Sequence, residues 1–343
     1  MSNQSFMDNP LLNLPHNYWS KLNILETQDA IRLVRKEFEE TLSSYLHLSK
    51  VQAPLLVRPE TGLNDNLNGI EKPVQVPLHK MDCTAEVVQS LAKWKRLALK
   101  RYGFAPGTGI YTNMMAIRPD ESPDILHSIT VDQWDWEKII KKQERTISIL
   151  KETAQKIVLA IKEVQNKLCA RFPQLASFIQ EDMFSITTQE LEDLYPTSTP
   201  QEREYKICSE HKTVLILKIG GKLKSGVRHD GRAPDYDDWD LNGDLLIWSP
   251  LLQYPIEISS MGIRVDADSL SKQLKLSGCE DRRSLPFHQF ILQNKLPYTM
   301  GGGIGQSRLC MLLLEKAHIG EVQASVWPNE VFQTCEKHGV HLL

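Results

Sequence analysis

The chain has 343 residues, of which 41% are hydrophobic and 24% are charged, and its formal net charge is −3. This composition is typical of a globular protein with one large domain or two ordinary ones. The charge balance describes neither a polybasic surface nor an acidic tail, so it gives no support to generic binding of nucleic acid.

Targeting and redox signals are sparse. The N-terminus has no basic region followed by a long apolar run, and no stretch approaches the length of a membrane span. The six cysteines include no close pair with the spacing of metal ligands, which is typical of reduced thiols. These features predict a soluble, cytoplasmic protein that does not associate with a membrane and has neither structural zinc nor disulfides.

The first 23 residues mix Asn, Pro and isolated apolar residues, which predicts an extension lying on the surface of a single domain formed by residues 24–343. From Thr27, apolar residues at steps of three and four predict an amphipathic helix. The following run "KVQAPLLVRPE" contains Pro54, so it predicts an edge strand or a strand whose pairing stops midway. A second helix is predicted in "EVVQSLAKWKRLALKRYGF".

The middle of the chain predicts a hairpin and then a long helix. Two strand-like segments, 110–117 and 127–134, flank a loop rich in Pro, Asp and Ser. From Ile140 to Leu168, apolar residues approximate a heptad seam, which can be buried either on the same domain or on a partner chain. Strands are then predicted in "KTVLILKIGG", "DLLIWSPLL" and "PIEISSMGIRV", and the last helix is expected after the glycines at 301–303.

Strands that look antiparallel and lack regular alternation with helices favour one fold class. We predict an α+β fold with a mixed, mainly antiparallel sheet flanked by helices.

The segment "TMGGGIGQSRL" has three consecutive glycines before a predicted helix. Glycines allow a ligand to approach the backbone, and a helix start offers free N–H groups, so the segment is suited to an anionic or flat ligand. Its spacing matches neither the Walker phosphate loop nor the dinucleotide fingerprint. A tightly packed glycine turn that leads into a core helix is the alternative.

Three polar groups interrupt apolar sequence. They are Arg118 at a strand end, the run "HDGRAPDYDDWDLNGD", and "EISSMGIRV", in which Glu257, Ser259 and Arg264 are expected to share a strand face. Each alone can be a solvated turn, an exposed cation or a weak surface pair. Together with Arg308 and the glycines, they are what a nucleoside triphosphate with magnesium requires.

The order of these parts resembles the catalytic core of class II aminoacyl-tRNA synthetases. The closer resemblance is to the ammonia-dependent asparagine synthetases, which are aspartate–ammonia ligases on that core, and it extends from about residue 31 to residue 327. The runs that carry it are "VQAPLL", "DNLNGIEKPVQV", "SLAKWKR", "LHSITVDQWDWE", "GGKLKSGVRHDGRAPDYDDW", "LNGDLLIW", "EISSMGIRVD" and "GGGIGQSRL". This chain departs from the family pattern in its N-terminal extension and in the direct joining of "DDWD" to "LNGD".

The resemblance implies the ATP-dependent amidation of L-aspartate with ammonia, through β-aspartyl-AMP, with release of AMP and pyrophosphate. It also implies a homodimer formed by the first helix and the Pro54 strand. Glutamine-dependent synthetases of the N-terminal nucleophile type expose an N-terminal cysteine, whereas here Met1 is followed by Ser2. We therefore expect free ammonia as the nitrogen donor.

The resemblance also implies roles for residues at the ATP end. Arg118 would bind the α-phosphate and the incoming carboxylate, and Arg308 would bind the γ-phosphate and the adenine. Further ATP contacts are expected from Glu257, Ser259, Arg264, Gly301, Gly302 and Gly303. The expected Mg²⁺ ligands are Asp244 and Glu257.

The aspartate end needs a cationic site for the α-carboxylate and an anionic site for the α-amine. We assign Lys95 and Arg232 to the first, Asp135 and Asp237 to the second, and Ser90, Gln133 and Tyr236 to neighbouring contacts. The resemblance offers Asp65 as the group that attracts ammonium and removes its proton. On the local sequence alone, Asp65 reads as the cap of an Asx turn. The catalytic residues are therefore predicted to be Asp65, Arg118, Gln133 and Arg308.

Two other functions stay open on the sequence. An aspartyl- or asparaginyl-tRNA synthetase would need an anticodon-binding module, commonly a β-barrel of about a hundred residues, and no such module is evident. The second open function is that of an inactive relative that acts as a binding subunit.

Overall fold

The computed structural model of the chain describes residues 14–65 and 72–343. Eight strands form the main sheet in the order β1-β5-β6-β11-β10-β9-β8-β7, and a small sheet has the order β2-β4-β3. Within the main sheet, β1 pairs with β5 and β7 pairs with β8 in parallel, and the other neighbours are antiparallel. The predicted α+β class with a mixed, mainly antiparallel sheet is therefore confirmed.

The strands are β1 (Leu48–Lys50), β2 (Leu56–Val57), β3 (Gln75–Leu78), β4 (Cys83–Val87), β5 (Gly109–Ile117), β6 (Thr130–Ile139), β7 (Phe184–Thr187), β8 (Thr213–Leu217), β9 (Asp237–Ser249), β10 (Tyr254–Arg264) and β11 (Thr299–Gly305). The α-helices are α2 (Ile24–Leu46), α3 (Ala92–Arg101), α4 (Ile147–Arg171), α5 (Thr188–Leu194), α6 (Pro200–His211), α7 (Ala267–Leu276), α8 (Pro286–Leu292), α9 (Gln306–Leu313) and α10 (Asn329–Lys337). Short 3-10 helices are η2 (Pro59–Thr61), η3 (His79–Met81), η4 (Lys142–Glu144), η5 (Glu280–Ser284) and η6 (Ile319–Glu321). None of the helices in these ranges has both the length and the apolar character that a membrane crossing requires.

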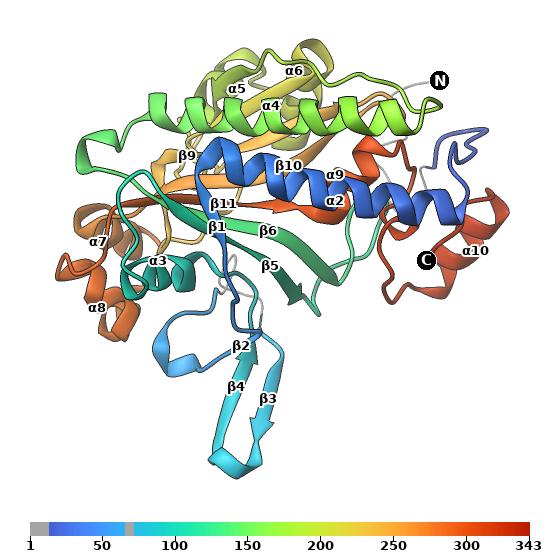
Figure 1. The fold of residues 1–343 in the computed structure, drawn as a ribbon. Helices are drawn as coiled ribbons and strands as arrows, with labels where there is room; N and C mark the ends of the chain where they lie inside the picture. The colour runs from blue at the N-terminus through green and yellow to red at the C-terminus, as the bar shows by residue number, and fades with distance from the viewer. Residues whose placement is uncertain (1–13, 66–71) are drawn as a thin grey trace.

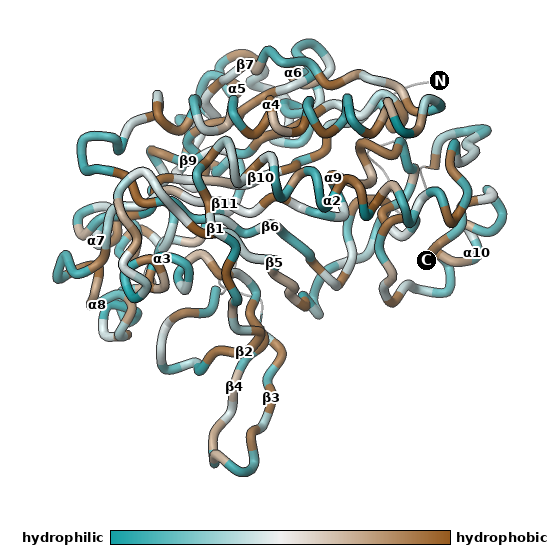
Figure 2. Tube along the Cα trace, in the orientation of Figure 1, coloured by the Kyte–Doolittle hydropathy of each residue, from teal (hydrophilic) through white to brown (hydrophobic). Residues whose placement is uncertain are grey.

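Two long helices, α2 and α4, lie side by side along the main sheet, whereas α3, α7 and α8 lie beyond its other side (Figure 1). Hydrophobic and hydrophilic residues alternate along α4, and its apolar positions belong to the main core (Figure 2). The predicted seam is thus buried within this chain. The small β2-β4-β3 sheet projects away from the body of the molecule (Figure 1).

The predicted first helix is α2, whose N-cap Asn23 forms a reciprocal capping box with Glu26. Pairing of the following strand stops at Lys50, and Pro54 lies in the unpaired segment before β2. The predicted hairpin is β5–β6, although β6 begins at Thr130 and continues to Ile139.

Three predictions about the helices were wrong. The long helix begins at Ile147 rather than near Ile140, because η4 and its capping turn lie between them. The second helix begins only at Ala92, because residues 86 and 87 pair in β4. The helix after the glycines is α9, but α10 follows it.

Candidate active site

One cavity of about 570 Å³ lies where β6, β10 and β11 meet the β5–β6 loop, the loop before β9 and the start of α9. It brings together most of the predicted site residues, although their sequence positions range from 65 to 308. Those that line it are Asp65, Ser90, Arg118, Gln133, Asp135, Arg232, Tyr236, Asp237, Glu257, Arg264, Gly302, Gly303 and Arg308. The convergence supports a shared site, and the individual roles remain predictions.

Lys95 and Asp244 do not line the cavity. Lys95 is fully buried, and its Nζ donates to Asp135 and, over 2.8 Å, to the carbonyl of Trp136. The expected direct contact between Lys95 and the α-carboxylate of aspartate is therefore corrected: the ammonium group lies behind Asp135. Asp244 is buried and accepts a 2.6 Å hydrogen bond from Arg232.

Ser259 does not line the cavity either, because β10 contains a β-bulge. Glu257 is opposite Leu246, but Ser259 is opposite Leu245, so one extra residue is inserted between them. The bulge reverses the alternation of side chains beyond it. Ser260 therefore lines the cavity together with Glu257, while Ser259 is buried. The expected ATP contact through Ser259 is corrected accordingly.

The three glycines lie inside β11, which leads into α9, and neighbouring atoms fill the space beside each of them. A Cβ on Gly301 would lie 2.1 Å from Glu137 Oε2, and a Cβ on Gly303 would lie 2.3 Å from Gln133 Oε1. Gly301 is absent from the cavity wall, whereas Gly302 and Gly303 line it. A side chain at position 301 would collide with the ion pair of Glu137 and Arg264. This ion pair, and not a flat ligand ring, explains why position 301 needs a glycine.

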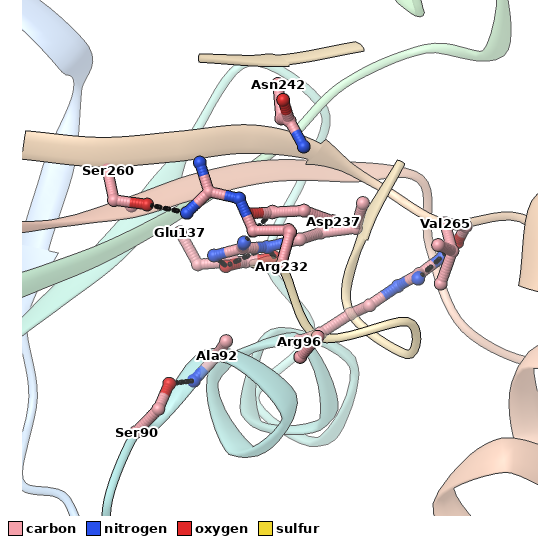
Figure 3. A network of polar contacts seen from close by, with 12 residues as sticks. Ser90, Ala92, Arg96, Glu137, Arg232, Asp237, Asn242, Ser260 and Val265 are labelled. Carbon is pink, nitrogen blue, oxygen red and sulfur yellow. Dashed lines mark hydrogen bonds and ion pairs between the residues drawn. The ribbon is translucent and has the colours of Figure 1, made fainter. Parts of the chain in front are cut away.

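Alternating charges form a continuous network at the floor of the cavity, part of which is seen in Figure 3. The ion-pair contacts run from Lys95 through Glu137, Arg264, Asp237 and Arg232 to Asp244, with Asp135 joined to Lys95. Three cations and four carboxylates leave a formal excess of one negative charge. A floor of this kind is suited to a cationic amine.

Burial and pairing change the acidity of groups in this floor. Burial raises the pKa of Asp135, although Lys95 opposes the rise. Burial also lowers the pKa of Lys95 against the attraction of its carboxylate neighbours. The phenol of Tyr236 has its pKa raised well above the ordinary value by burial and by the nearby Asp65 and Asp237 carboxylates.

The opposite end of the cavity carries two arginines that are less tightly paired. Arg118 follows β5, and its buried Nε has no hydrogen-bond partner among the described residues. Arg308 is in the first turn of α9 and donates over 3.1 Å to the carbonyl of Glu257. Asp132 fixes that turn, since it accepts from the backbone N–H of Ser307 over 3.0 Å. This end is suited to phosphate groups.

Asp65 lies beside a buried ionic cluster. Asp235 is fully buried, forms ion pairs with Lys93 at 2.8 Å and Arg282 at 3.1 Å, and shares a 2.9 Å hydrogen bond with His288. Lys93 also donates over 2.9 Å to the carbonyl of Asn64, the residue before Asp65. The cluster therefore anchors the chain that carries Asp65.

Ser90 has a structural bond in addition to its place in the cavity wall. Its Oγ accepts from the backbone N–H of Ala92 over 3.1 Å, at the start of α3 (Figure 3). The hydroxyl proton remains able to donate to a ligand.

The sequence reasoning missed Glu137 and Gln89. Glu137 follows Gln133 and Asp135 at two-residue steps along β6, so the alternation in "DQWDWE" was a usable signal. It was overlooked because the strand was expected to end at Trp134. Gln89 lines the cavity, and no local pattern marks it.

A magnesium site was expected at Asp244 and Glu257, which lie on the adjacent strands β9 and β10. Among the described residues, no three side chains of His, Cys, Asp or Glu are arranged to hold a metal. Two carboxylates still fit Mg²⁺, which commonly takes one or two protein oxygens and completes its shell with phosphate and water.

Comparison with known proteins assigns the family. The family model described as aspartate–ammonia ligase matches residues 25–339. The chain belongs to the aspartate–ammonia ligase family. An aspartate–ammonia ligase from Lactobacillus johnsonii is 58% identical over 332 residues, which cover 96% of this chain and 99% of the relative. One from Ruminiclostridium cellulolyticum is 56% identical over 330 residues, covering 96% and 98%.

The solved structures with a similar fold are class II synthetases, as the sequence predicts. Asparaginyl-tRNA synthetase from Pyrococcus horikoshii, complexed with asparaginyl-adenylate, has a TM-score of 0.64 at 16% identity. The match covers 88% of the chain described here and 70% of the synthetase chain. An asparaginyl-tRNA synthetase from Entamoeba histolytica has a TM-score of 0.60 at 17% identity, with 87% and 66% covered.

Proposed function

We propose that the cavity makes L-asparagine from L-aspartate, ammonia and ATP in two steps. In the first, a β-carboxylate oxygen of aspartate attacks the α-phosphorus, the bond to the β-phosphate breaks, and β-aspartyl-AMP and pyrophosphate form. In the second, the ammonia nitrogen bonds to the carbonyl carbon of the β-carboxyl group, the bond from that carbon to the oxygen of AMP breaks, and the proton lost from nitrogen goes to a carboxylate. The observation that carries this proposal is that Arg118, Arg308 and an acidic floor line one cavity.

At the ATP end, positioning and charge stabilisation supply most of the catalysis. Arg118 holds the α-phosphate and the attacking carboxylate, and its unpaired Nε supports this role. Arg308 holds the γ-phosphate and covers the adenine. Arg264 acts from below the nucleotide, where its pairing with Glu137 keeps it in place.

At the aspartate end, Arg232 binds the α-carboxylate, while Asp135 and Asp237 bind the α-amine. Ser90, Gln133 and Tyr236 complete the pocket through neutral contacts. Lys95 acts through Asp135, because its ammonium is buried behind that carboxylate. Asp65 attracts ammonium and takes its proton.

Magnesium neutralises the phosphates when it is bound. Glu257, which lines the cavity half-exposed and 3.8 Å from Arg308, would hold it, and Asp244, which lies outside the cavity wall and is paired with Arg232, is the second expected ligand. Chelation with EDTA should abolish aspartate-dependent pyrophosphate exchange, and added Mg²⁺ should restore it.

We also propose a cytoplasmic homodimer built around α2 and the Pro54 segment. Exposed apolar side chains support a contact there, since Leu55 is 57% exposed and Met115, on β5 beside β1, is 59% exposed. Sedimentation at micromolar concentration should give a dimer, and a monomer would contradict the proposal.

Incubation with ATP, aspartate and ammonium, with and without tRNA, tests the function. Asparagine and AMP should form without tRNA. Formation of aminoacyl-tRNA instead would support the synthetase alternative, and the absence of both products would support an inactive relative.

A further inference from the structure

Gln89 is a residue of the cavity wall whose buried side-chain amide forms no hydrogen bond with the described residues. The side chain is fully buried, and neither Oε1 nor Nε2 has a hydrogen-bond partner among the described residues. Buried polar groups are nearly always paired, because an unpaired one loses its hydration without compensation. A buried unpaired amide that borders a cavity is therefore suited to bind something that enters the cavity.

Asn64 holds Gln89 next to Asp65. Asn64 Oδ1 accepts from the backbone N–H of Asp65 over 3.0 Å and from that of Gln89 over 2.9 Å. Asn64 Nδ2 donates over 3.1 Å to the carbonyl of Val87, which secures the same strand end. The backbone N–H groups of Asp65 and Gln89, which are 24 positions apart in the sequence, thus donate to the same oxygen atom, Asn64 Oδ1.

These hydrogen bonds of Asn64, which we call the Asn64 clamp, are held rigidly because a buried ion pair supports Asn64. Asn64 is buried, and its carbonyl accepts from Lys93, which is in turn held by Asp235. The distance between the backbones of Asp65 and Gln89 is therefore set by the fold and not by the ligand.

We propose that Gln89 and Asp65 together form the subsite for the nitrogen donor, which binds as ammonium and reacts as ammonia. This inference rests on the proposed function. Ammonium has only donors, so its site needs acceptors. The Asp65 carboxylate supplies the negative charge and takes the proton, while Gln89 Oε1 accepts a second N–H and orients the nitrogen before and after that transfer.

The amino-acid substrate has a different set of partners. Its α-carboxylate and α-amine carry full charges, and the charged network of Arg232, Asp135 and Asp237 matches them. A neutral amide beside one carboxylate is better matched to a small monovalent cation. Gln89 is thereby assigned to ammonium and not to aspartate.

The test compares Gln89→Met with Gln165→Met in the full-length protein. Both glutamines are fully buried, but Gln165 Oε1 accepts from the backbone N–H groups of Phe178 and Ile179. Gln89→Met should raise the KM for ammonium roughly tenfold or more, which is the effect of losing one hydrogen bond to a charged group. Aspartate-dependent pyrophosphate exchange, which needs no ammonia, should stay within about twofold.

Thermal unfolding supplies an independent measurement. Gln89→Met should keep or raise the melting temperature, because it removes two unpaired groups, whereas Gln165→Met should lower it and leave the KM for ammonium unchanged.

Three results would overturn the inference: an unchanged KM for ammonium in Gln89→Met, slower pyrophosphate exchange or a higher KM for aspartate, or a loss of stability equal to that of Gln165→Met. Failure of the unsubstituted protein to make asparagine from ammonium would instead overturn the proposed function, and this inference with it.

Discussion

Arg264 and Glu137 bridge across β11 through the space beside Gly301. Arg264 lies on β10 and Glu137 on β6, the two neighbours of β11. Arg264 donates to both carboxylate oxygens of Glu137, with its Nη2 2.8 Å from Oε2, and both side chains are buried. The ion pair can form only because the residue between them has no side chain, so a glycine and two charges are required together.

The first prediction is that Gly301→Ala displaces this ion pair. The new Cβ would lie 2.1 Å from Glu137 Oε2 and 2.6 Å from Arg264 Nη2, well inside contact distance. Overpacking of this kind should cost about 3 kcal/mol of unfolding free energy. Urea denaturation measures this change in the free energy of unfolding. Gly221→Ala is the control, because nothing lies within 4 Å of its Cβ position. Equal stability of the two variants would contradict the assigned role of Gly301.

The second prediction concerns the buried cluster beside Asp65. Asp235→Asn leaves Lys93 and Arg282 without their buried counter-charge, which should cost about 3–5 kcal/mol. The exposed Asp240, 3.5 Å from Lys272, supplies the control Asp240→Asn, which should change stability by less than about 0.5 kcal/mol.

The same cluster predicts a dependence on pH. Burial raises the pKa of Asp235, but Lys93, His288 and Arg282 outweigh it and hold that pKa below its ordinary value. The unfolded chain then binds the proton more readily. The stabilisation from Asp235 is therefore full above roughly pH 5 and declines as the pH falls below about 4. The stability difference between unsubstituted protein and Asp235→Asn should shrink below that pH, and a difference that widens there would refute the assignment.

The third prediction separates catalysis from folding at Arg308. Its described partners are the backbone oxygen and the carboxylate of Glu257, so Arg308→Ala should leave unfolding nearly unchanged. Aspartate-dependent pyrophosphate exchange should fall by about 10² or more, because a charged donor to the phosphates is lost. Arg32→Ala, which removes an exposed arginine 3.2 Å from Asp29, should keep full exchange activity. Normal exchange in Arg308→Ala would rule out its phosphate role.

The fourth prediction tests how firmly residues 14–23 belong to the domain. Tyr18 donates over 2.8 Å to the buried Glu321, which also accepts from the backbone N–H of Ala317 over 2.9 Å. Losing a hydrogen bond to a buried carboxylate in Tyr18→Phe should cost about 1.5–3 kcal/mol in urea denaturation. The exposed Tyr102→Phe should be neutral, because that ring is 53% exposed. No change in Tyr18→Phe would contradict the stabilising role assigned to the Tyr18–Glu321 hydrogen bond.

The elements with clear periodicity and the family could be predicted from the amino-acid sequence alone. The three- and four-residue steps after Thr27 predicted α2, and alternation around a polar loop predicted the β5–β6 hairpin. These patterns are local, because each side chain's direction follows from its position along a helix or strand. Long runs such as "GGKLKSGVRHDGRAPDYDDW" are sufficient to predict the aspartate–ammonia ligase family, which the family match confirms.

Which of the expected residues line the cavity depends on how the whole chain folds. Because β10 contains one extra residue, the side chain of Ser260 lines the cavity in place of that of Ser259. Lys95 is buried behind Asp135. The clamp at Asn64, which joins residues 65 and 89, also has no local signature. Bulges and long-range hydrogen bonds depend on which strands become neighbours, and that pairing is set by the packing of the whole chain rather than by the residues on either side.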